Sequence, residues 1–332
     1  MANGAAAPPG LAFPRETFAT LTPAPFLQAH LQQAQSIRPN GRALEESRDP
    51  VINTGSLSHC NGSAVARLGD TAVVCGVRAE LLLASSVASP PNEDTTEDEA
   101  IEELGLLVPN CELSTGCSPA HLPGSPPGSL AQSLSYRISS LLYSSRLIQP
   151  SDLYVEYVLP RTDDDIPDQG PTTVIKAYWT LYIDILCIAL DGNAFDAAWT
   201  AVIAALKDCK LPKAWWDQDR EMVLCSPVAK DAHRLSLRSV PVPTTFALFS
   251  TLSPLKQRSK AEYWLLADPD NFEEGLCTEI VTLTLSSKSE GDHEIVRIEK
   301  RGGGMIGKTA LAQILDLSKE RTARWRAALK LG

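Results

Sequence analysis

The chain has 332 residues, 44% of them hydrophobic, which is enough for one large domain or two modest ones with an apolar core. Its formal net charge of −10 argues against a protein that grips nucleic acid over its whole surface, although a local basic path is compatible with it. The first residues lack the basic and apolar regions of a signal peptide, and no apolar run approaches the roughly twenty residues of a membrane span. We therefore expect a soluble intracellular protein.

The eight cysteines are scattered, and the sequence contains no C-x-x-C pair. The nearest two, Cys111 and Cys117, lie in a segment rich in Pro, Gly and Ser. A zinc site there would need further Cys or His ligands that the sequence does not supply. We expect free buried thiols, no metal site and no cofactor.

A first lobe is predicted over residues 23–212, after an arm at residues 1–22 that is rich in Ala, Pro and Gly and is expected to be flexible. The lobe begins with a short helical pattern, TPAPFLQAHLQQAQSI. Runs rich in β-formers then follow, broken by Asn-Gly and Gly-Asp pairs, which predicts antiparallel strands joined by hairpins. The run DTAVVCGV is apolar on both faces and predicts a central strand.

Two polar insertions are predicted in this lobe, at residues 85–109 and 160–172. The first opens with SSVASPPNEDTTEDEAIEE, which is acidic, contains proline and has no periodicity, so we expect a solvated loop at 85–103. The second, RTDDDIPDQGPTT, precedes the long β run VIKAYWTLYIDILCIAL.

Two helices are predicted in the first lobe. In the segment after Gly128, apolar residues recur at helical spacing, and Ser129 with Gln132 suggests a capping box. The segment 194–207 is amphipathic, and Pro212 is expected to close it. The apolar positions are Leu130, Leu134, Ile138 and Leu141 in the first helix, and Phe195, Trp199, Val202 and Leu206 in the second.

A second lobe is predicted over residues 213–332. Four strand-like runs, LRSVPVPTTFALFS, AEYWLLADP, EIVTLTLSS and HEIVRIEK, precede an amphipathic helix from about Thr309 to Leu329. Strands come first and helices last in each half. The sequence therefore predicts an α+β protein with two related lobes.

Residues Gly302 to Thr309, GGGMIGKT, match the phosphate-loop pattern G-x-x-x-x-G-K-[ST] literally. Such a loop opens the first βαβ unit of a parallel sheet, and later strands supply the groups that hold Mg²⁺ and position water. Here only one predicted helix follows, and the preceding run HEIVRIEK alternates polar and apolar residues, unlike a strand buried on both faces. A glycine-rich turn is favoured, with a nucleotide hydrolase as the remote alternative.

RPNGR followed by NTGSLSHCNGSAVARLGDTAVVCGV resembles the opening of the RNase PH family, whose common form is R-P-D-G-R, then A-D-G-S-A, then L-G-x-T-x-V-x-C. The resemblance continues through the first predicted helix, DILCIALDGN and DPDNFEEG, and covers roughly residues 36–320. Within the family, the sequence is most similar to the RNase PH-type subunits of the eukaryotic RNA exosome ring. This implies an RNase PH-type fold, with two related lobes of mixed or antiparallel sheet packed against helices.

Enzymes of this family are phosphorolytic 3′ exoribonucleases, in which phosphate attacks the terminal internucleotide bond. The chemistry needs a cationic pocket for phosphate and carboxylates that hold a metal or assist proton transfer. The family's phosphate-binding arginine falls on Leu130, and its pair of aspartates falls on Glu274 and Ile280. Leucine and isoleucine offer neither charge nor donor, so the resemblance implies a non-catalytic member with no catalytic residues.

An active phosphorolytic exoribonuclease is the alternative. A register shifted by one residue would restore an acidic pair at Glu273 and Glu279 with the family's spacing. Asp184 and Asp191 also match family positions, but Asp191 lies in an Asp-Gly turn, and Asn193 begins the segment that replaces the family's Gly-Thr-Arg. We expect the two aspartates to serve structure or lobe packing.

The resemblance also implies partners. Six RNase PH-like subunits would form a ring around a pore that threads RNA, with RNA-binding cap subunits on one face and a hydrolytic exoribonuclease on the other. Arg67, Arg78 and Arg137 are candidate RNA contacts, with a surface salt bridge as the alternative for each. The expected role is support of 3′-to-5′ RNA processing and decay, including rRNA maturation, in the nucleus, the nucleolus and the cytoplasm.

Overall fold

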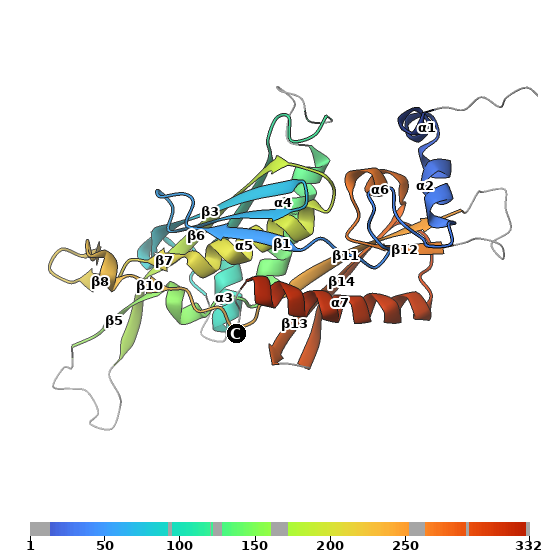
Figure 1. Cartoon of the computed structure of the whole chain (residues 1–332). Coiled ribbons are helices and arrows are strands. Elements are labelled where there is room, and N and C mark those ends of the chain that lie inside the picture. Colours follow the sequence, from blue (N-terminus) through green and yellow to red (C-terminus); the bar gives the residue numbers. More distant parts are fainter. Residues whose placement is uncertain are drawn as a thin grey trace, which may run out of the picture.

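The computed structural model describes residues 14–91, 95–119, 121, 128–160, 172–251, 263–289 and 292–329. Two β-sheets with flanking helices lie side by side and form two lobes (Figure 1). The predicted α+β class with two lobes is confirmed. Within the described ranges, no helix is both long and apolar enough to cross a membrane.

The first lobe is built on a six-stranded sheet in the order β1-β2-β3-β6-β4, with β5 also paired to β6. Its strands are β1 (Pro50–Thr54), β2 (Gly62–Leu68), β3 (Thr71–Leu83), β4 (Leu107–Leu113), β5 (Tyr154–Val158) and β6 (Thr173–Ala189). The predicted hairpin at Gly69-Asp70 is confirmed: Leu68 pairs with Thr71, and Gly69 adopts a φ of 61°, which glycine tolerates without steric cost. The long apolar run forms the central strand β6.

Helices α4 (Ser129–Ser144) and α5 (Ala194–Asp208) pack on one face of this sheet, α5 against β2 and β3 and α4 against β4. The predicted capping box of α4 is wrong, because Gly128 is the N-cap and no side chain caps the helix. Residues 194–206 of α5 are all buried, so this helix lies inside the protein rather than on its surface. It ends at Asp208, before Pro212, and a short strand β7 (Lys210–Leu211) follows.

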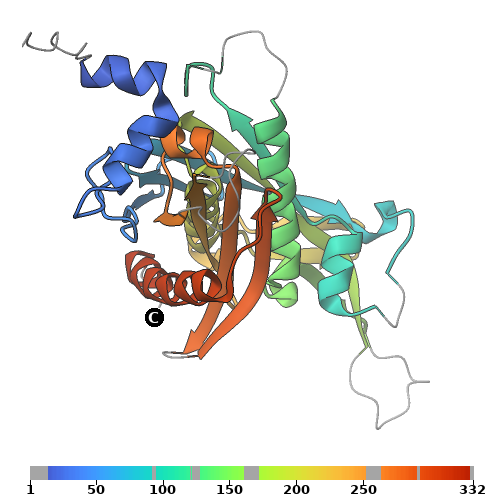
Figure 2. The same cartoon turned by 90° about the vertical axis from the view of Figure 1, so that its right-hand side faces the viewer.

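The second lobe is a four-stranded antiparallel sheet in the order β12-β11-β13-β14, covered by the C-terminal helix α7 (Lys308–Ala328). Its strands are β11 (Val242–Ser250), β12 (Tyr263–Ala267), β13 (Glu279–Ser289) and β14 (Asp292–Arg301), with the short helix α6 (Asn271–Leu276) before β13. Ile314 of α7 belongs to an apolar cluster with Phe246 and Val281. Figure 2 shows α4 of the first lobe running beside the β13–β14 hairpin of the second.

Three predicted boundaries differ from the structure. Residues 15–21 of the predicted arm form helix α1 (Arg15–Leu21), whereas residues 1–13 lie outside the described ranges. Helix α2 (Pro23–Leu31), assigned to the first lobe, packs instead on the second, because Leu27 and Leu31 share an apolar cluster with Phe249. Residues 214–240, assigned to the second lobe, contribute side chains to the core of the first. These are Ala214, Val223, Leu235, Leu237 and Val240, and the segment also forms β8 (Ala214–Asp217), β9 (Met222–Cys225) and β10 (His233–Arg234).

The acidic insertion is not a continuous loop. Residues Glu97–Glu103 form helix α3, and β4 begins at Leu107, before the predicted end of the insertion. Thr96 and Glu99 make a capping box at the start of α3, and Ala100 and Ile101 are buried. The predicted loop at 85–103 is therefore wrong for its second half. Of the second insertion, residues 161–171 lie outside the described ranges.

Candidate functional site

A cavity of about 240 Å³ lies between the two lobes, where α4 faces β13 and β14. Leu130, Glu274 and Ile280, the three positions singled out from the sequence, all line it. They come from α4, α6 and β13, so the fold brings together residues that lie 150 positions apart in the chain. The remaining lining residues are Ser133, Leu134, Arg137, Leu190, Asn193, Ala194, Phe195, Thr245, Thr282, Glu299, Lys300 and Arg301.

Two aliphatic side chains line the cavity at the positions to which the resemblance assigns the family's charged groups. Leu130 lies in the first turn of α4, and Ile280 follows the first residue of β13. Neither side chain can bind an anion, a metal ion or a proton. Both line one cavity, so the two losses inferred from the sequence fall in the same site.

Arg137 points into this cavity but is held by the protein itself. Its Nε donates to Glu299 Oε2 at 2.6 Å, and its Nη2 donates to Thr282 Oγ1 at 3.2 Å. The guanidinium also lies 3.8 Å from the ring centroid of Phe195, a cation–π contact that joins α4 to α5. Arg137 therefore bridges the lobes, which is a structural role that does not require RNA.

Glu274 is the carboxylate that the resemblance assigns to the family's acidic pair. Its Oε1 accepts a hydrogen bond of 2.9 Å from the backbone N–H of Asn193, the residue before α5. Burial raises the pKa of Glu274, while the Asn193 amide and the charge of Arg301 oppose the rise. This carboxylate fixes the start of α5, and Glu299, the other acidic residue that lines the cavity, is paired with Arg137.

The alternative acidic pair, Glu273 and Glu279, is not assembled. Glu273 is fully buried, forms an ion pair with Arg38 and accepts from the Asp270 backbone N–H at 3.0 Å. Glu279 accepts from Lys300 Nζ at 2.6 Å. Neither side chain lines the cavity, and each forms an ion pair with a different cation. The register-shifted pair is therefore wrong, because the two side chains point to different partners.

The glycine loop after β14 surrounds one of the protein's own carboxylates. The Gly304 N–H donates to Glu279 Oε1 at 2.7 Å, and Lys300 Nζ donates to the Gly302 carbonyl at 2.8 Å. The hydrogen bond from Lys300 to Glu279, helped by the Gly304 amide, lowers the pKa of Glu279. The strand before the loop is an edge strand of an antiparallel sheet rather than a parallel strand. The nucleotide-loop alternative is wrong, and the glycine-rich turn before the last helix is confirmed.

The other predicted residues lie elsewhere. Asp184 pairs with Arg78 at 3.5 Å across β3 and β6, and both side chains are half exposed. Asp191 pairs with Arg48 at 3.7 Å beside the second lobe, as expected for a role in lobe packing. The exposed Arg67 reaches only its own turn, with Nη2 3.5 Å from the Gly69 carbonyl oxygen.

Cys111 and Cys117 are buried free thiols. Burial raises the pKa of the Cys111 thiol to about 11, which disfavours the thiolate that a metal would need. Among the residues that the structure describes, no cluster of three His, Cys, Asp or Glu side chains could hold a metal ion.

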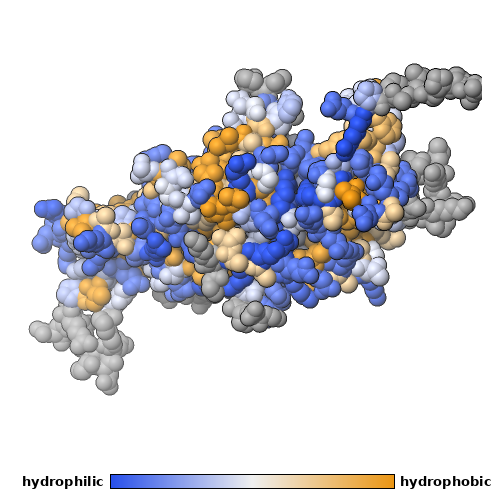
Figure 3. All heavy atoms as spheres, in the orientation of Figure 1, coloured by the Kyte–Doolittle hydropathy of each residue, from blue (hydrophilic) through white to orange (hydrophobic). Residues whose placement is uncertain are grey.

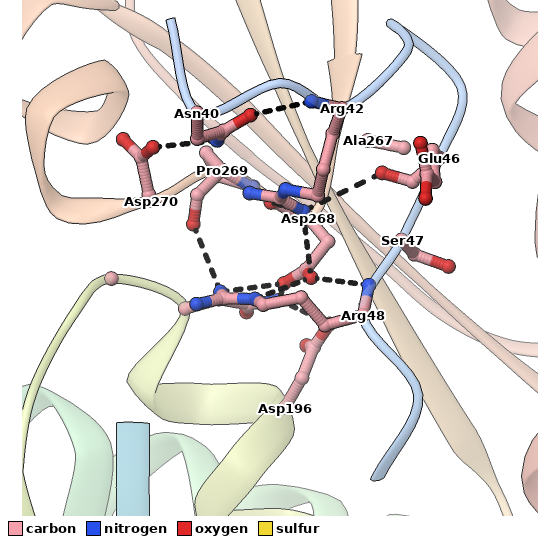
Figure 4. A network of polar contacts seen from close by, with 12 residues as sticks. Asn40, Arg42, Glu46, Ser47, Arg48, Asp196, Ala267, Asp268, Pro269 and Asp270 are labelled. Carbon is pink, nitrogen blue, oxygen red and sulfur yellow. Dashed lines mark hydrogen bonds and ion pairs between the residues drawn. The ribbon is translucent and has the colours of Figure 1, made fainter. Parts of the chain in front are cut away.

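A buried ionic network behind the cavity was missed by the sequence analysis. Figure 4 shows Arg42 and Arg48 directed at the carboxylate of Asp268, in the loop after β12. Arg48 Nε donates to Asp268 Oδ2 at 2.7 Å, and Asn193 Nδ2 also donates to Asp268. Burial alone would raise the pKa of Asp268, but the hydrogen bond from Arg48 and the nearby guanidinium charges hold it well below its usual range.

The network continues on both sides of Asp268. Arg38 is 1% exposed and donates to Glu273 and to the Ala267 carbonyl, the latter at 2.7 Å. Asp196 of α5 lies 3.0 Å from Nη1 of Arg321 in α7, and burial raises the pKa of Asp196 against the effect of that guanidinium. Buried charges thus tie the segment before β1 to the second lobe and the start of α5 to the C-terminal helix. Arg38, Arg42 and Arg48 lie within eleven residues, which was the signal present in the sequence, but their partners Asp268 and Glu273 lie more than 200 positions away.

Residues 46–212 match the 3′ exoribonuclease family, domain 1. Together with the two-lobed fold and the cavity between the lobes, this match shows that the chain belongs to the RNase PH family of 3′ exoribonucleases.

Its relatives are exosome proteins. The exosome complex component rrp43 of Schizosaccharomyces pombe is 36% identical over 311 residues, which span 94% of this chain and 96% of the relative. The exosome complex component Rrp42 of Methanothermobacter thermautotrophicus is 27% identical and covers 86% of both chains.

Solved structures give the same fold. A chain of an archaeal exosome core superposes with a TM-score of 0.61 at 22% identity, covering 95% of this chain and 99% of that one. A chain of the Archaeoglobus fulgidus exosome with RNA bound to the active site gives a TM-score of 0.59 at 21% identity, covering 92% and 96%.

Proposed function

We propose that this chain is a non-catalytic structural subunit of the RNase PH-like ring of the exosome core. The observation that carries the proposal is the pairing of Leu130 and Ile280 in one interlobe cavity. The family's phosphorolysis needs a cation at the first position and a carboxylate at the second. Both requirements fail in the same place, so a compensating change at only one of them would not restore the reaction.

Two of the three cations that line the cavity are bound inside the protein, which supports this proposal. Arg137 is bound by Glu299 and Thr282 and Lys300 by Glu279, whereas Arg301 is exposed. Arg137 or Lys300 could bind phosphate only by giving up its ion pair within the protein. Of the two carboxylates that line the cavity, Glu299 is paired with Arg137 and Arg297, and the raised pKa of Glu274 disfavours the charged form that a metal would bind.

The partners follow from the relatives, which are named as exosome components. The chain would take one place in a six-member ring of RNase PH-like subunits that encloses an RNA-threading channel. Cap subunits that bind RNA and a hydrolytic exoribonuclease would complete the assembly. In this role the chain supports 3′-to-5′ RNA processing and decay, including rRNA maturation, in the nucleus, the nucleolus and the cytoplasm.

The proposal is tested with the purified chain, RNA carrying a free 3′ end, Mg²⁺ and inorganic phosphate. We expect no release of nucleoside diphosphate. The matched control is a catalytic RNase PH enzyme in the same buffer, which must release it. Release by this chain that disappears in Glu274→Gln would refute the non-catalytic assignment.

A further inference from the structure

The C-terminal helix α7 turns polar side chains toward the interior of the protein. Its buried residues recur at helical spacing along one face, and they are Ile314, Ser318, Arg321, Thr322 and Trp325. Hydrophilic side chains also predominate on the surface over this helix (Figure 3), so α7 lacks the purely apolar inner face of an ordinary surface helix. The interior must therefore supply hydrogen-bond partners for the polar groups that α7 buries.

Arg321 brings more donors into the interior than the protein pairs there. The side chain is 1% exposed, and its Nη1 lies 3.0 Å from Asp196 Oδ2. No residue that the structure describes accepts a well-aligned hydrogen bond from its Nε, Nη1 or Nη2. The guanidinium lies 4.6 Å from the ring centroid of Trp325, whose indole N–H likewise finds no acceptor among the described residues. Both side chains can only donate, so this part of the interior holds an excess of buried donors.

A buried acceptor lies beside these donors. Asn193 Nδ2 donates to Asp196 Oδ2 at 2.9 Å, which is the same oxygen that faces Arg321. A second bond from this Nδ2 to Asp268 fixes the orientation of the amide, because Oδ1 could not face two carboxylates. Asn193 Oδ1 therefore points away from both, and within the described ranges it has no donor. The Asn193 amide and the Arg321 guanidinium are thus neighbours that do not bond to each other.

Two buried hydroxyl groups also face α7 or belong to it. Ser318 lies one turn before Arg321 on the same face of the helix. Thr244 of β11 is paired with Leu283, which shares an apolar cluster with Ile314 of α7, so Thr244 faces this helix as well. In the part of the chain that the structure describes, neither hydroxyl has a hydrogen-bond partner.

These five residues, Asn193, Thr244, Ser318, Arg321 and Trp325, are here called the α7 polar cluster. We propose that the α7 polar cluster binds ordered internal water molecules. A water molecule accepts hydrogen bonds from Arg321 or Trp325 and donates to Asn193 Oδ1, so it serves both kinds of group at once. A halide ion could accept from the donors, but it could not donate to Asn193 and would lie close to the carboxylate of Asp196. The chemistry therefore favours water over an anion.

The site would join α7 to the start of α5 and to β11, where the two lobes meet. Hydration of this junction lowers the cost of burying the Arg321–Asp196 pair, because the guanidinium keeps hydrogen-bond partners that the protein itself does not supply. The inference concerns this chain alone and does not depend on the proposed function.

The first test measures transfer of magnetisation from water to the indole N–H groups of the full chain, labelled with ¹⁵N-tryptophan. The Trp325 N–H should show a cross-peak to long-lived water although its side chain is 1% exposed. Trp199 is the matched control, because it is equally buried but donates to the Pro241 carbonyl at 2.7 Å, and it should show none. Trp325→Phe identifies the resonance. An absent Trp325 cross-peak, or equal cross-peaks from both indoles, would overturn the inference.

The second test locates the ligand directly, in a crystal structure of the chain soaked in sodium bromide. We expect electron density for water within hydrogen-bond distance of the Arg321 guanidinium and of Asn193 Oδ1, without anomalous signal from bromide at that place. An anomalous peak in the α7 polar cluster would show an anion site and refute the assignment to water. Protein groups that satisfy these atoms, with no solvent density between them, would refute it as well.

Discussion

Trp199 lies at the centre of the contact between α5 and the rest of the protein, and its removal should be severely destabilising. The side chain is 1% exposed, and its Nε1 donates to the Pro241 carbonyl at 2.7 Å. Truncation of a buried Trp to Ala costs about 3–5 kcal/mol through lost transfer energy and the cavity left behind. The unpaired carbonyl of Pro241 adds about 1–3 kcal/mol. Trp199→Ala should therefore lose about 4–8 kcal/mol, against a usual margin of about 5–15 kcal/mol.

The assay is chemical denaturation of the purified chain followed by circular dichroism, with Trp215→Ala as the matched control. Trp215 lies on β8 and is 41% exposed, so its truncation should change the free energy of unfolding by far less. The recovery of intact complex from cells should fall with Trp199→Ala and stay normal with the control. A loss below about 1 kcal/mol for Trp199→Ala would refute this reasoning, since it would mean that the site does not pack as described.

Three further predictions concern buried charges and the glycine loop. Arg38→Ala should cost about 3–5 kcal/mol of unfolding free energy, because it leaves Glu273 buried without its ion-pair partner, whereas substitution of the exposed Arg67 by Ala should stay within about 0.5 kcal/mol. Equal effects of the two substitutions in chemical denaturation would contradict the buried pair. The pKa of Asp268 is lowered in the folded state, so the stability that this carboxylate contributes is present above about pH 4 and is lost as the pH falls further. The free energy of unfolding should therefore fall less steeply with decreasing pH in Asp268→Asn than in wild type. An unchanged pH dependence would contradict a stabilising role of the charged Asp268. Lys308→Ala should leave complex assembly unchanged, and calorimetry should detect no ATP binding to the wild type or to the variant. Micromolar ATP binding by the wild type that is lost in the variant would show that the glycine loop binds nucleotide.

The parts of the fold that could be predicted are those with long, unambiguous periodicity. Strand β6 carries seventeen residues and helix α5 fifteen, and both were placed within two residues of their observed ends. Helix α3 was missed because its seven residues bury only two side chains, too few to produce a visible hydrophobic period. Its capping pair, Thr96 and Glu99, was the signal present in the sequence.

The lobe boundaries were harder to predict from the sequence, because some short segments pack against the lobe whose residues are distant from them in sequence. Leu27 and Leu31 sit beside β11 and β12 although more than 200 residues separate them. The network around Asp268 was not predicted for the same reason, since its partner Arg48 lies 220 positions earlier in the sequence. Local sequence patterns carry no information on such pairings.

The candidate site could be located from the resemblance but not from the residues alone. Leu130, Glu274 and Ile280 have no unusual local pattern, and only their correspondence to family positions marked them before the cavity was seen. The contact of Glu274 with the Asn193 backbone could not be foreseen, since it depends on the left-handed conformation of Asn193, with φ 49°, at the start of α5. A residue in that conformation turns its N–H in a direction that no sequence motif specifies.

The most direct test of the central claim is phosphate-dependent release of nucleoside diphosphate from RNA by the assembled exosome core, compared between complexes that carry wild-type chain and Glu274→Gln. The substitution removes the charge of the single retained carboxylate and leaves its shape and its hydrogen-bond acceptor, so assembly should be unchanged. If this chain contributes no chemistry, the two complexes will release nucleoside diphosphate at the same rate, whether that rate is zero or is set by another subunit. A rate that falls tenfold or more with Glu274→Gln, in a complex of normal composition, would contradict the account.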